Sequence, residues 1–269
     1  MDLAPRHGVD TAAQRFGTGE RAALAIHCML GTSSMWEPVL APLGATIAAT
    51  AFDLPGHGKS APWPVDDTPG AYQTLATRIA ASFIDRPVDL IGHSFGAVVA
   101  LRLAVAAPEA VRSLTLIEPV LFSAVADTPE GHLWRRRQDD YETLYAAGDA
   151  EGAARDFVGK WGVGTPWETL SDRHRARFTA QMPIVASVSA SNFSDPGQIC
   201  RPGGFEAIDA PVLLIHGSDS PPVMAEICEA IAGRLPDVGV ASVPGAGHML
   251  PLTHARQLSD LIALNLERS

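Results

Sequence analysis

A serine between two glycines is the residue best placed to do chemistry in this sequence. Residues 92–96 read Gly-His-Ser-Phe-Gly, a G-x-S-x-G pattern centred on Ser94. An apolar run over 88–91 predicts a strand before it, and an apolar segment over 97–106 predicts a helix after it. Such a strand-to-helix turn exposes the serine hydroxyl above the carboxyl end of a sheet, where a helix N-terminus favours a developing anion. Ser94 is therefore predicted to be a nucleophile.

A histidine must accompany this serine, because a hydroxyl attacks poorly until a base accepts its proton. The sequence contains nine histidines. His248 lies between the last predicted strand and the last predicted helix, at the edge where open α/β sheets place their sites. We predict His248 as the general base, whereas His93 should point away from Ser94 and His254 begins a helix. Three more histidines at strand ends are expected to pack around the site: His27, His57 and His216.

The third member of such a site is a carboxylate that fixes the imidazole tautomer and stabilises the imidazolium. Asp219 follows the predicted strand 212–216 by a short turn, so it should reach the same edge as His248. It also gives the chain order serine, acid, histidine that accompanies nucleophiles on strand-to-helix turns. We predict that Asp219 orients His248. Two alternatives stay open: Asp219 caps the next helix, or Glu118, at the end of strand 113–117, is the acid.

Two backbone N–H groups are expected to stabilise the oxyanion of a tetrahedral intermediate. The residue after the nucleophile, Phe95, is predicted to supply one of them. The other is expected from the loop that follows the first strong strand, within residues 25–32, and Met29 is the predicted donor.

The composition is that of an acidic, folded protein. The 269 residues are 46% hydrophobic and 19% charged, which suits one large α/β domain. The formal net charge of −10 repels phosphate backbones and anionic lipids, so we expect neither nucleic acid nor membrane as a partner. The first residues carry no apolar signal segment and the three cysteines are widely spaced, which predicts a cytoplasmic protein. No motif indicates a metal or a cofactor, and none sets the oligomeric state.

The order of the apolar runs predicts a mostly parallel sheet flanked by helices, which is the α/β class. The alternation of strands and helices stops between about residues 121 and 205, where helical patterns rich in aromatic residues replace it. We therefore expect a core formed by residues 1–121 and 206–269, with a helical cap, residues 122–205, inserted into it. The aromatic side chains of this cap either line an acyl pocket or form the cap's own small core. Strands are expected over 22–28, 46–52, 88–91, 113–117, 212–216 and 239–243, and helices over 72–83, 97–106, 224–234 and 254–266.

With these motifs in this order, the chain resembles the α/β-hydrolase superfamily of esterases, thioesterases, lactonases and carbon–carbon hydrolases. The likeness covers most of 22–107 and 210–266, and Asp-Leu-Pro-Gly-His-Gly-Lys-Ser at 53–60 resembles another common motif of the superfamily. One position departs from it, because Cys28 follows His27 where the superfamily usually has glycine.

The resemblance implies a hydrolase that cleaves a small-molecule carboxylic ester or thioester through an acyl-enzyme on Ser94. Dehalogenases and epoxide hydrolases of this fold use an aspartate nucleophile instead of a serine. A carbon–carbon bond hydrolase, a perhydrolase, and a ligand-binding receptor that retains the catalytic residues stay open as alternatives, since one fold hosts many functions.

Overall fold

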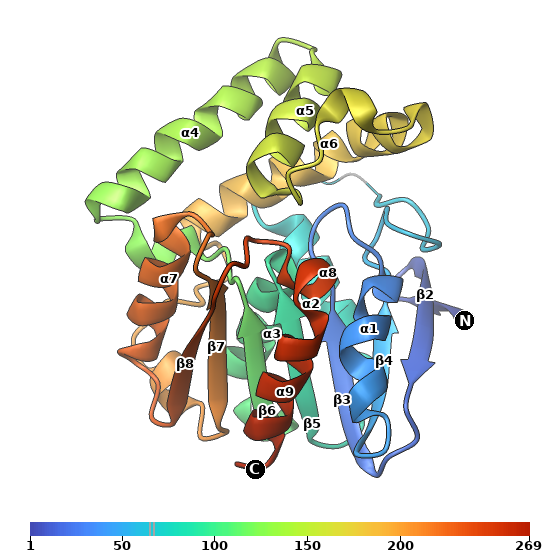
Figure 1. Ribbon diagram of the computed structural model, residues 1–269, viewed down its shortest axis with the longest axis vertical. Coiled ribbons are helices and arrows are strands. Elements are labelled where there is room, and N and C mark those ends of the chain that lie inside the picture. Colours follow the sequence, from blue (N-terminus) through green and yellow to red (C-terminus); the bar gives the residue numbers. More distant parts are fainter. Residues whose placement is uncertain (65, 67) are drawn as a thin grey trace.

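The chain folds around an eight-stranded sheet with the strand order β1-β2-β4-β3-β5-β6-β7-β8. The computed structural model describes residues 1–64, 66 and 68–269, apart from the side chain of Asp139. Strands β3 to β8 run parallel to one another (Figure 1). Strand β2 pairs antiparallel with β4, and β1 pairs antiparallel with β2 at the edge of the sheet. The strands are β1 (Asp2–Arg6), β2 (Val9–Phe16), β3 (Arg21–Ile26), β4 (Ile47–Phe52), β5 (Val88–His93), β6 (Val111–Ile117), β7 (Val212–Gly217) and β8 (Val238–Val243).

The predicted α/β class is confirmed, and each of the six expected strands has a counterpart within a few residues. The hairpin of β1 and β2 was not predicted. Its first strand reads Asp-Leu-Ala-Pro-Arg and is mostly exposed at the edge of the sheet. A search for continuous apolar runs finds strands that are buried on both faces, and it misses an edge strand of this kind.

Two hydrophobic cores lie on the two faces of the sheet because successive side chains of a strand point to opposite faces. In β3, Leu24 and Ile26 belong to the core beneath α2, α3 and α7, whereas Ala23 and Ala25 belong to the core beneath α1 and α9. The helices that cover the sheet are α1 (Glu37–Leu40), α2 (Ala71–Ala81), α3 (Phe95–Ala106), α7 (Pro222–Ala232), α8 (Leu250–Thr253) and α9 (Ala255–Leu266). Short 3-10 turns are η1 (Ser33–Trp36), η2 (Ala41–Leu43), η3 (Pro108–Ala110), η4 (Phe122–Val125), η5 (Trp167–Thr169) and η6 (Phe205–Ala207).

Three further helices form a layer above the carboxyl edge of the parallel strands (Figure 1). This helical layer consists of α4 (Pro129–Ala146), α5 (Ala150–Trp161) and α6 (Asp172–Ser194), and α5 packs against both of the others. Side-chain caps mark where all three begin. Thr128 Oγ1 accepts from the Gly131 N–H at 3.0 Å, Asp149 Oδ1 from the Gly152 N–H at 2.8 Å, and Ser171 Oγ from the His174 N–H at 3.3 Å. In the described part of the chain, no helix is long and apolar enough to cross a membrane.

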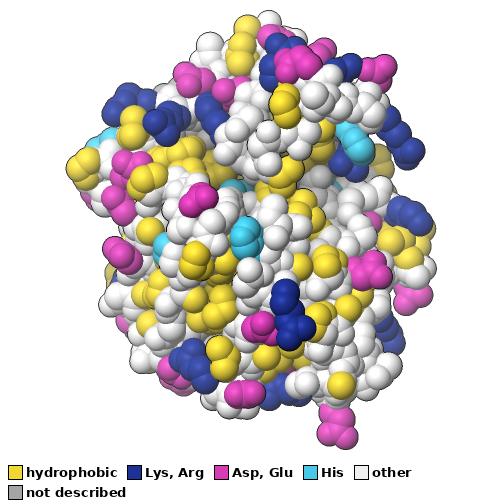
Figure 2. Space-filling view, viewed as in Figure 1, with side chains coloured by type: hydrophobic (Ala, Val, Ile, Leu, Met, Phe, Trp, Pro, Cys, Tyr) yellow, Lys and Arg dark blue, Asp and Glu magenta, His cyan; other side chains and the backbone are white. Residues whose placement is uncertain are grey.

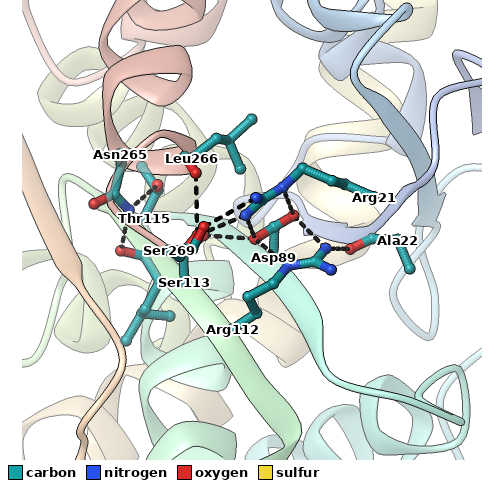
Figure 3. Close-up of polar contacts among 10 residues, drawn as sticks. Arg21, Ala22, Asp89, Arg112, Ser113, Thr115, Asn265, Leu266 and Ser269 are labelled. Carbon is teal, nitrogen blue, oxygen red and sulfur yellow. Dashed lines mark hydrogen bonds and ion pairs between the residues drawn. The ribbon is translucent and has the colours of Figure 1, made fainter.

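A buried carboxylate links three neighbouring strands at the amino end of the parallel sheet (Figure 3). Asp89, at the start of β5, accepts hydrogen bonds from Arg21 of β3 and Arg112 of β6, the shortest at 2.8 and 2.6 Å. The Ser113 hydroxyl also donates to it at 2.8 Å, and Arg21 reaches the last residue, Ser269. Burial alone would raise the pKa of Asp89, but these hydrogen bonds outweigh burial and lower it. The network therefore fixes the strand whose other end carries Ser94.

Candidate active site

Ser94 lies on a tight turn between β5 and α3, with φ of 56° and ψ of −119°. A positive φ is unfavourable for a residue with a side chain, so the surrounding packing must hold it in place. The two glycines of the motif allow that packing. A Cβ on Gly92 would lie 2.4 Å from the Gly96 carbonyl oxygen, and a Cβ on Gly96 would lie 2.1 Å from the Ile26 carbonyl oxygen. The G-x-S-x-G spacing thus lets the turn close against β3.

His248 meets Ser94 at this turn. The Ser94 hydroxyl lies 2.9 Å from His248 Nε2, although 154 residues separate them in sequence. The loop that follows β8 brings His248 there, as expected from the sequence. His93 points elsewhere, and its Nε2–H donates to the backbone carbonyl of His248 at 2.8 Å. Burial, and next the proximity of His248, hold the pKa of His93 well below its usual range, so His93 is a neutral support for the loop.

Glu118 supplies the carboxylate at the other side of the imidazole. Its Oε2 lies 2.9 Å from His248 Nδ1, and the side chain is fully buried. Its Oε1 accepts from the Gly217 N–H at 2.7 Å and from the Ser220 hydroxyl at 2.8 Å. With a carboxylate as acceptor, Nδ1 carries the ring proton and Nε2 is free to accept the Ser94 proton. The hydrogen-bonded order is therefore Ser94, His248, Glu118.

The prediction that Asp219 orients His248 is wrong. Asp219 is exposed at the turn after β7, and its carboxylate accepts from the Ser218 hydroxyl at 2.9 Å. Its backbone N–H donates to the Ala246 carbonyl at 2.9 Å, which fixes the turn with the side chain toward solvent. Glu118 follows the neighbouring strand β6 and has a positive φ of 51°. The sequence signal available for Glu118 was a carboxylate directly after the buried strand β6.

The two predicted oxyanion donors, Met29 and Phe95, line one cavity together with Ser94. Phe95 is the first residue of α3, and N–H groups in the first turn have no acceptor within their helix. In the loop after β3, the Leu30 N–H donates to His57 Nε2 at 3.1 Å. The Met29 N–H, by contrast, donates to no backbone acceptor among the described residues. Both groups are thus free to bind an anion.

Two buried histidines support the loop that carries Met29. His27 Nδ1–H donates to the Cys28 carbonyl at 2.7 Å, and its Nε2 accepts from the Leu54 N–H at 2.9 Å. His57 Nδ1–H donates to the Pro55 carbonyl at 3.0 Å. Burial lowers the pKa of both side chains, that of His57 to about 3, so each ring is neutral with a defined tautomer. These histidines position the backbone, consistent with the supporting place expected of them.

Two cavities meet at Ser94, beneath the helical layer. The larger has a volume of about 500 Å³ and includes His248 in its wall, and Figure 2 shows hydrophobic side chains in the hollow below the helical layer. The smaller has a volume of about 40 Å³ and does not include His248. Trp161 lines both and packs edge-on against the His248 ring, with 4.7 Å between ring centroids. In the described part of the chain, no group of three or more metal-ligating side chains lies close enough to hold a metal ion.

The similarity to known proteins agrees with this geometry. Residues 23–261 match the family described as the Alpha/beta hydrolase family, so the chain belongs to that family and the resemblance drawn from its motifs is confirmed. Over 117 residues it is 36% identical to the lipase LipV of Mycobacterium tuberculosis, which covers 42% of this chain and 43% of the lipase. The chain thus matches less than half the length of that relative.

Two further similarities extend over most of the chain. It is 27% identical over 230 residues to the pimeloyl-[acyl-carrier protein] methyl ester esterase of Nitrosomonas europaea, covering 80% of this chain and 84% of the esterase. The enol-lactonase of Burkholderia xenovorans LB400 superimposes with a TM-score of 0.76 at 16% identity, covering 99% of this chain and all of that one. At this identity the structural likeness shows the fold alone.

Proposed function

We propose that this protein hydrolyses small-molecule carboxylic esters or thioesters through an acyl-enzyme on Ser94. The observation that carries the proposal is the continuous hydrogen-bonded series from Ser94 through His248 to Glu118, with both bonds at 2.9 Å. Nucleophile, base and orienting acid in that arrangement activate a hydroxyl for attack on a carbonyl carbon. The similarity to a lipase and to a methyl ester esterase supports an ester as the substrate.

In the first half of the reaction, Ser94 Oγ attacks the carbonyl carbon while its proton moves to His248 Nε2. Glu118 keeps the proton of Nδ1 in place and stabilises the imidazolium that forms. The carbonyl oxygen becomes negative and accepts hydrogen bonds from the Met29 and Phe95 N–H groups, which are fixed before the reaction begins. His248 then gives its proton to the leaving group, and the acyl group stays on Ser94.

In the second half, His248 takes a proton from water, and the hydroxide oxygen attacks the acyl carbon. Collapse of the second tetrahedral intermediate returns the proton to Ser94 and releases the acid. No step requires a metal or a cofactor.

The position of His248 supports an assignment of the two cavities to the two parts of the substrate. The group that protonates the leaving oxygen or sulfur must lie beside it, and His248 lines only the larger cavity. The leaving group therefore occupies the larger cavity. The smaller cavity, which Ser94 shares with both oxyanion donors, takes the acyl group.

The helical layer acts in this account as a cap, residues 122–205, over a core of residues 1–121 and 206–269. Its aromatic side chains serve both of the purposes expected from the sequence. Trp134 and Tyr141 are buried among the cap helices, and Tyr141 also borders the smaller cavity. Phe157 and Trp161 line both cavities. The three cysteines are free thiols, which supports a reducing, cytoplasmic compartment.

Steady-state turnover on matched substrates tests the proposal. A panel of short-chain esters, the corresponding thioesters and a β-diketone separates acyl transfer to water from carbon–carbon cleavage. We expect sustained turnover of esters or thioesters, abolished in Ser94→Ala. Turnover of the diketone alone would favour the carbon–carbon hydrolase. Stoichiometric labelling by a fluorophosphonate without turnover of any substrate would favour the receptor.

A further inference from the structure

The smaller cavity has an unusual wall. Most of its lining is apolar, as expected for a site that holds a hydrocarbon chain. Four polar side chains from α4 and α6 nevertheless border it: Gln138, Tyr141, Ser189 and Asn192. All four are at least 94% buried, with exposed fractions of 6%, 0%, 4% and 5%. Polar groups at such depth are unfavourable unless each has a hydrogen-bond partner.

Three of these side chains satisfy one another. Gln138 Nε2 donates to the Tyr141 hydroxyl and, at 2.7 Å, to Ser189 Oγ. The Ser189 hydroxyl in turn donates to Glu142 Oε1 at 2.7 Å. This network joins α4 to α6, and it ends on a carboxylate.

Asn192 is the exception. Its side-chain amide makes no hydrogen bond with any described residue, and its Oδ1 is fully buried. A buried amide without partners destabilises the protein compared with an apolar side chain of the same shape. Asn192 lies on the same helix as Ser189 but outside the network, at the wall of the cavity that begins at Ser94. Its amide is therefore a polar group without a partner among the described residues, in the wall of that cavity.

We propose that the smaller cavity is an acyl subsite for a short hydroxyacyl group whose hydroxyl hydrogen-bonds to Asn192. A hydroxyl both donates and accepts, so it pairs with the amide in either orientation of the amide. A carboxylate fits less well, because Glu142 lies behind the network and no Lys or Arg is among the described lining residues. The volume of about 40 Å³ favours a short acyl chain over a long one.

The inference rests on the proposed ester hydrolysis, and a comparison of substrates separates the two. We would measure kcat/KM for ethyl butyrate, ethyl 2-hydroxybutyrate and both enantiomers of ethyl 3-hydroxybutyrate, which share one leaving group. At least one hydroxybutyrate should be preferred over butyrate. In Asn192→Leu, which keeps the size of the side chain but removes its hydrogen bonds, the hydroxybutyrate-to-butyrate ratio should fall by about tenfold. The same substrates are compared in both proteins, so differences in the intrinsic reactivity of the esters do not affect the change in the ratio.

Two further variants complete the test. Ser194→Ala changes an exposed residue of the same helix and should keep the wild-type ratio. Asn192→Thr restores a hydroxyl and should recover part of the preference. If Asn192→Leu does not fold, Asn192→Ala gives the same readout, because it only removes atoms. Ester turnover with no hydroxyl preference, or a preference that survives loss of the amide, overturns the subsite and leaves ester hydrolysis standing. Failure to turn over any ester or thioester overturns both.

Discussion

Glu118 and His248, 130 residues apart in sequence, share a 2.9 Å hydrogen bond, and both side chains are buried. Glu118 holds two further hydrogen bonds, from Gly217 and Ser220, so its carboxylate is fixed before any substrate binds. The acid that contacts His248 therefore follows β6, and the turn after β7 supplies hydrogen bonds that hold its carboxylate. Function should therefore be sensitive to Glu118 and tolerant of changes at Asp219.

Glu118→Gln keeps the size of the side chain but can present an amide N–H to His248 Nδ1. The imidazole then loses both its defined tautomer and the stabilising charge. We expect kcat to fall by up to about 10⁴-fold, the scale known for an acid-to-amide change in such sites. Asp219→Asn is the matched control, because its side chain is exposed, and it should stay within about twofold of wild type. The opposite ranking of the two variants in steady-state kinetics would return the acid to Asp219.

The buried histidines predict how stability depends on pH. Burial lowers the pKa of His57 to about 3 in the folded protein, whereas the unfolded value is about 6.5. The stabilisation from a neutral His57 is therefore complete above pH 6.5 and is lost progressively as the pH falls toward 3. Each pH unit in that window should lower the unfolding free energy by about 1.4 kcal/mol for this residue.

Urea unfolding between pH 7 and pH 4 measures this slope. His57→Gln retains an acceptor for the Leu30 N–H but does not titrate, so its stability should fall less steeply with acid. His7→Gln, at an exposed turn, is the control and should keep the wild-type slope. Equal slopes for wild type and His57→Gln would contradict the neutral, buried state assigned to His57.

The Asp89 network predicts a change in stability with little change in chemistry. Asp89→Asn leaves Arg21 and Arg112 without their shared carboxylate, at 23% and 30% side-chain exposure. Breaking a fully buried pair costs about 3 to 5 kcal/mol, and partial exposure of the arginines reduces this to about 2 kcal/mol. Asp260→Asn removes an exposed pair with Arg256 and should cost less than about 1 kcal/mol.

Denaturant unfolding and kcat on the same preparations decide this point. The folded fraction of Asp89→Asn should retain kcat within about twofold, because the network lies at the end of β5 opposite to Ser94. Equal stability losses in Asp89→Asn and Asp260→Asn would show that the buried network contributes no more than a surface pair.

Cys28 is predicted to shape the loop without taking part in the chemistry. Burial raises the pKa of its thiol to about 12, so the reactive thiolate is absent at neutral pH. The hydrogen bonds from His27 and Gly31 go to the Cys28 backbone carbonyl, and a change of side chain leaves that carbonyl in place. Cys28→Gly should therefore retain kcat/KM within about tenfold. Loss of nearly all activity from a variant with wild-type circular dichroism would indicate a direct role for the thiol.

The sequence was most informative where backbone geometry demands particular residues. A Cβ at either glycine of the motif would lie 2.4 Å or less from a backbone oxygen, so the motif marks a turn that only glycine allows at those two positions. His248 could be predicted because it lies between the last strand and the last helices, in a loop at the same edge of the sheet as Ser94. The acid could not be chosen, because Glu118 and Asp219 both follow buried strands at that edge. Which one points inward depends on the backbone of two turns, and local sequence did not distinguish them.

Trapping the acyl-enzyme tests the central claim most directly. The protein is mixed with an activated short ester, quenched in acid within milliseconds to seconds, and digested for mass spectrometry. We predict one acyl group per chain on the peptide that contains Ser94, formed as fast as a stoichiometric burst of the alcohol product. In Ser94→Ala the adduct should be absent and kcat should be lower by about 10³-fold or more. The activity that remains would come from substrate binding and the oxyanion donors. Sustained hydrolysis without acylation of Ser94, or wild-type turnover in Ser94→Ala, would contradict the account.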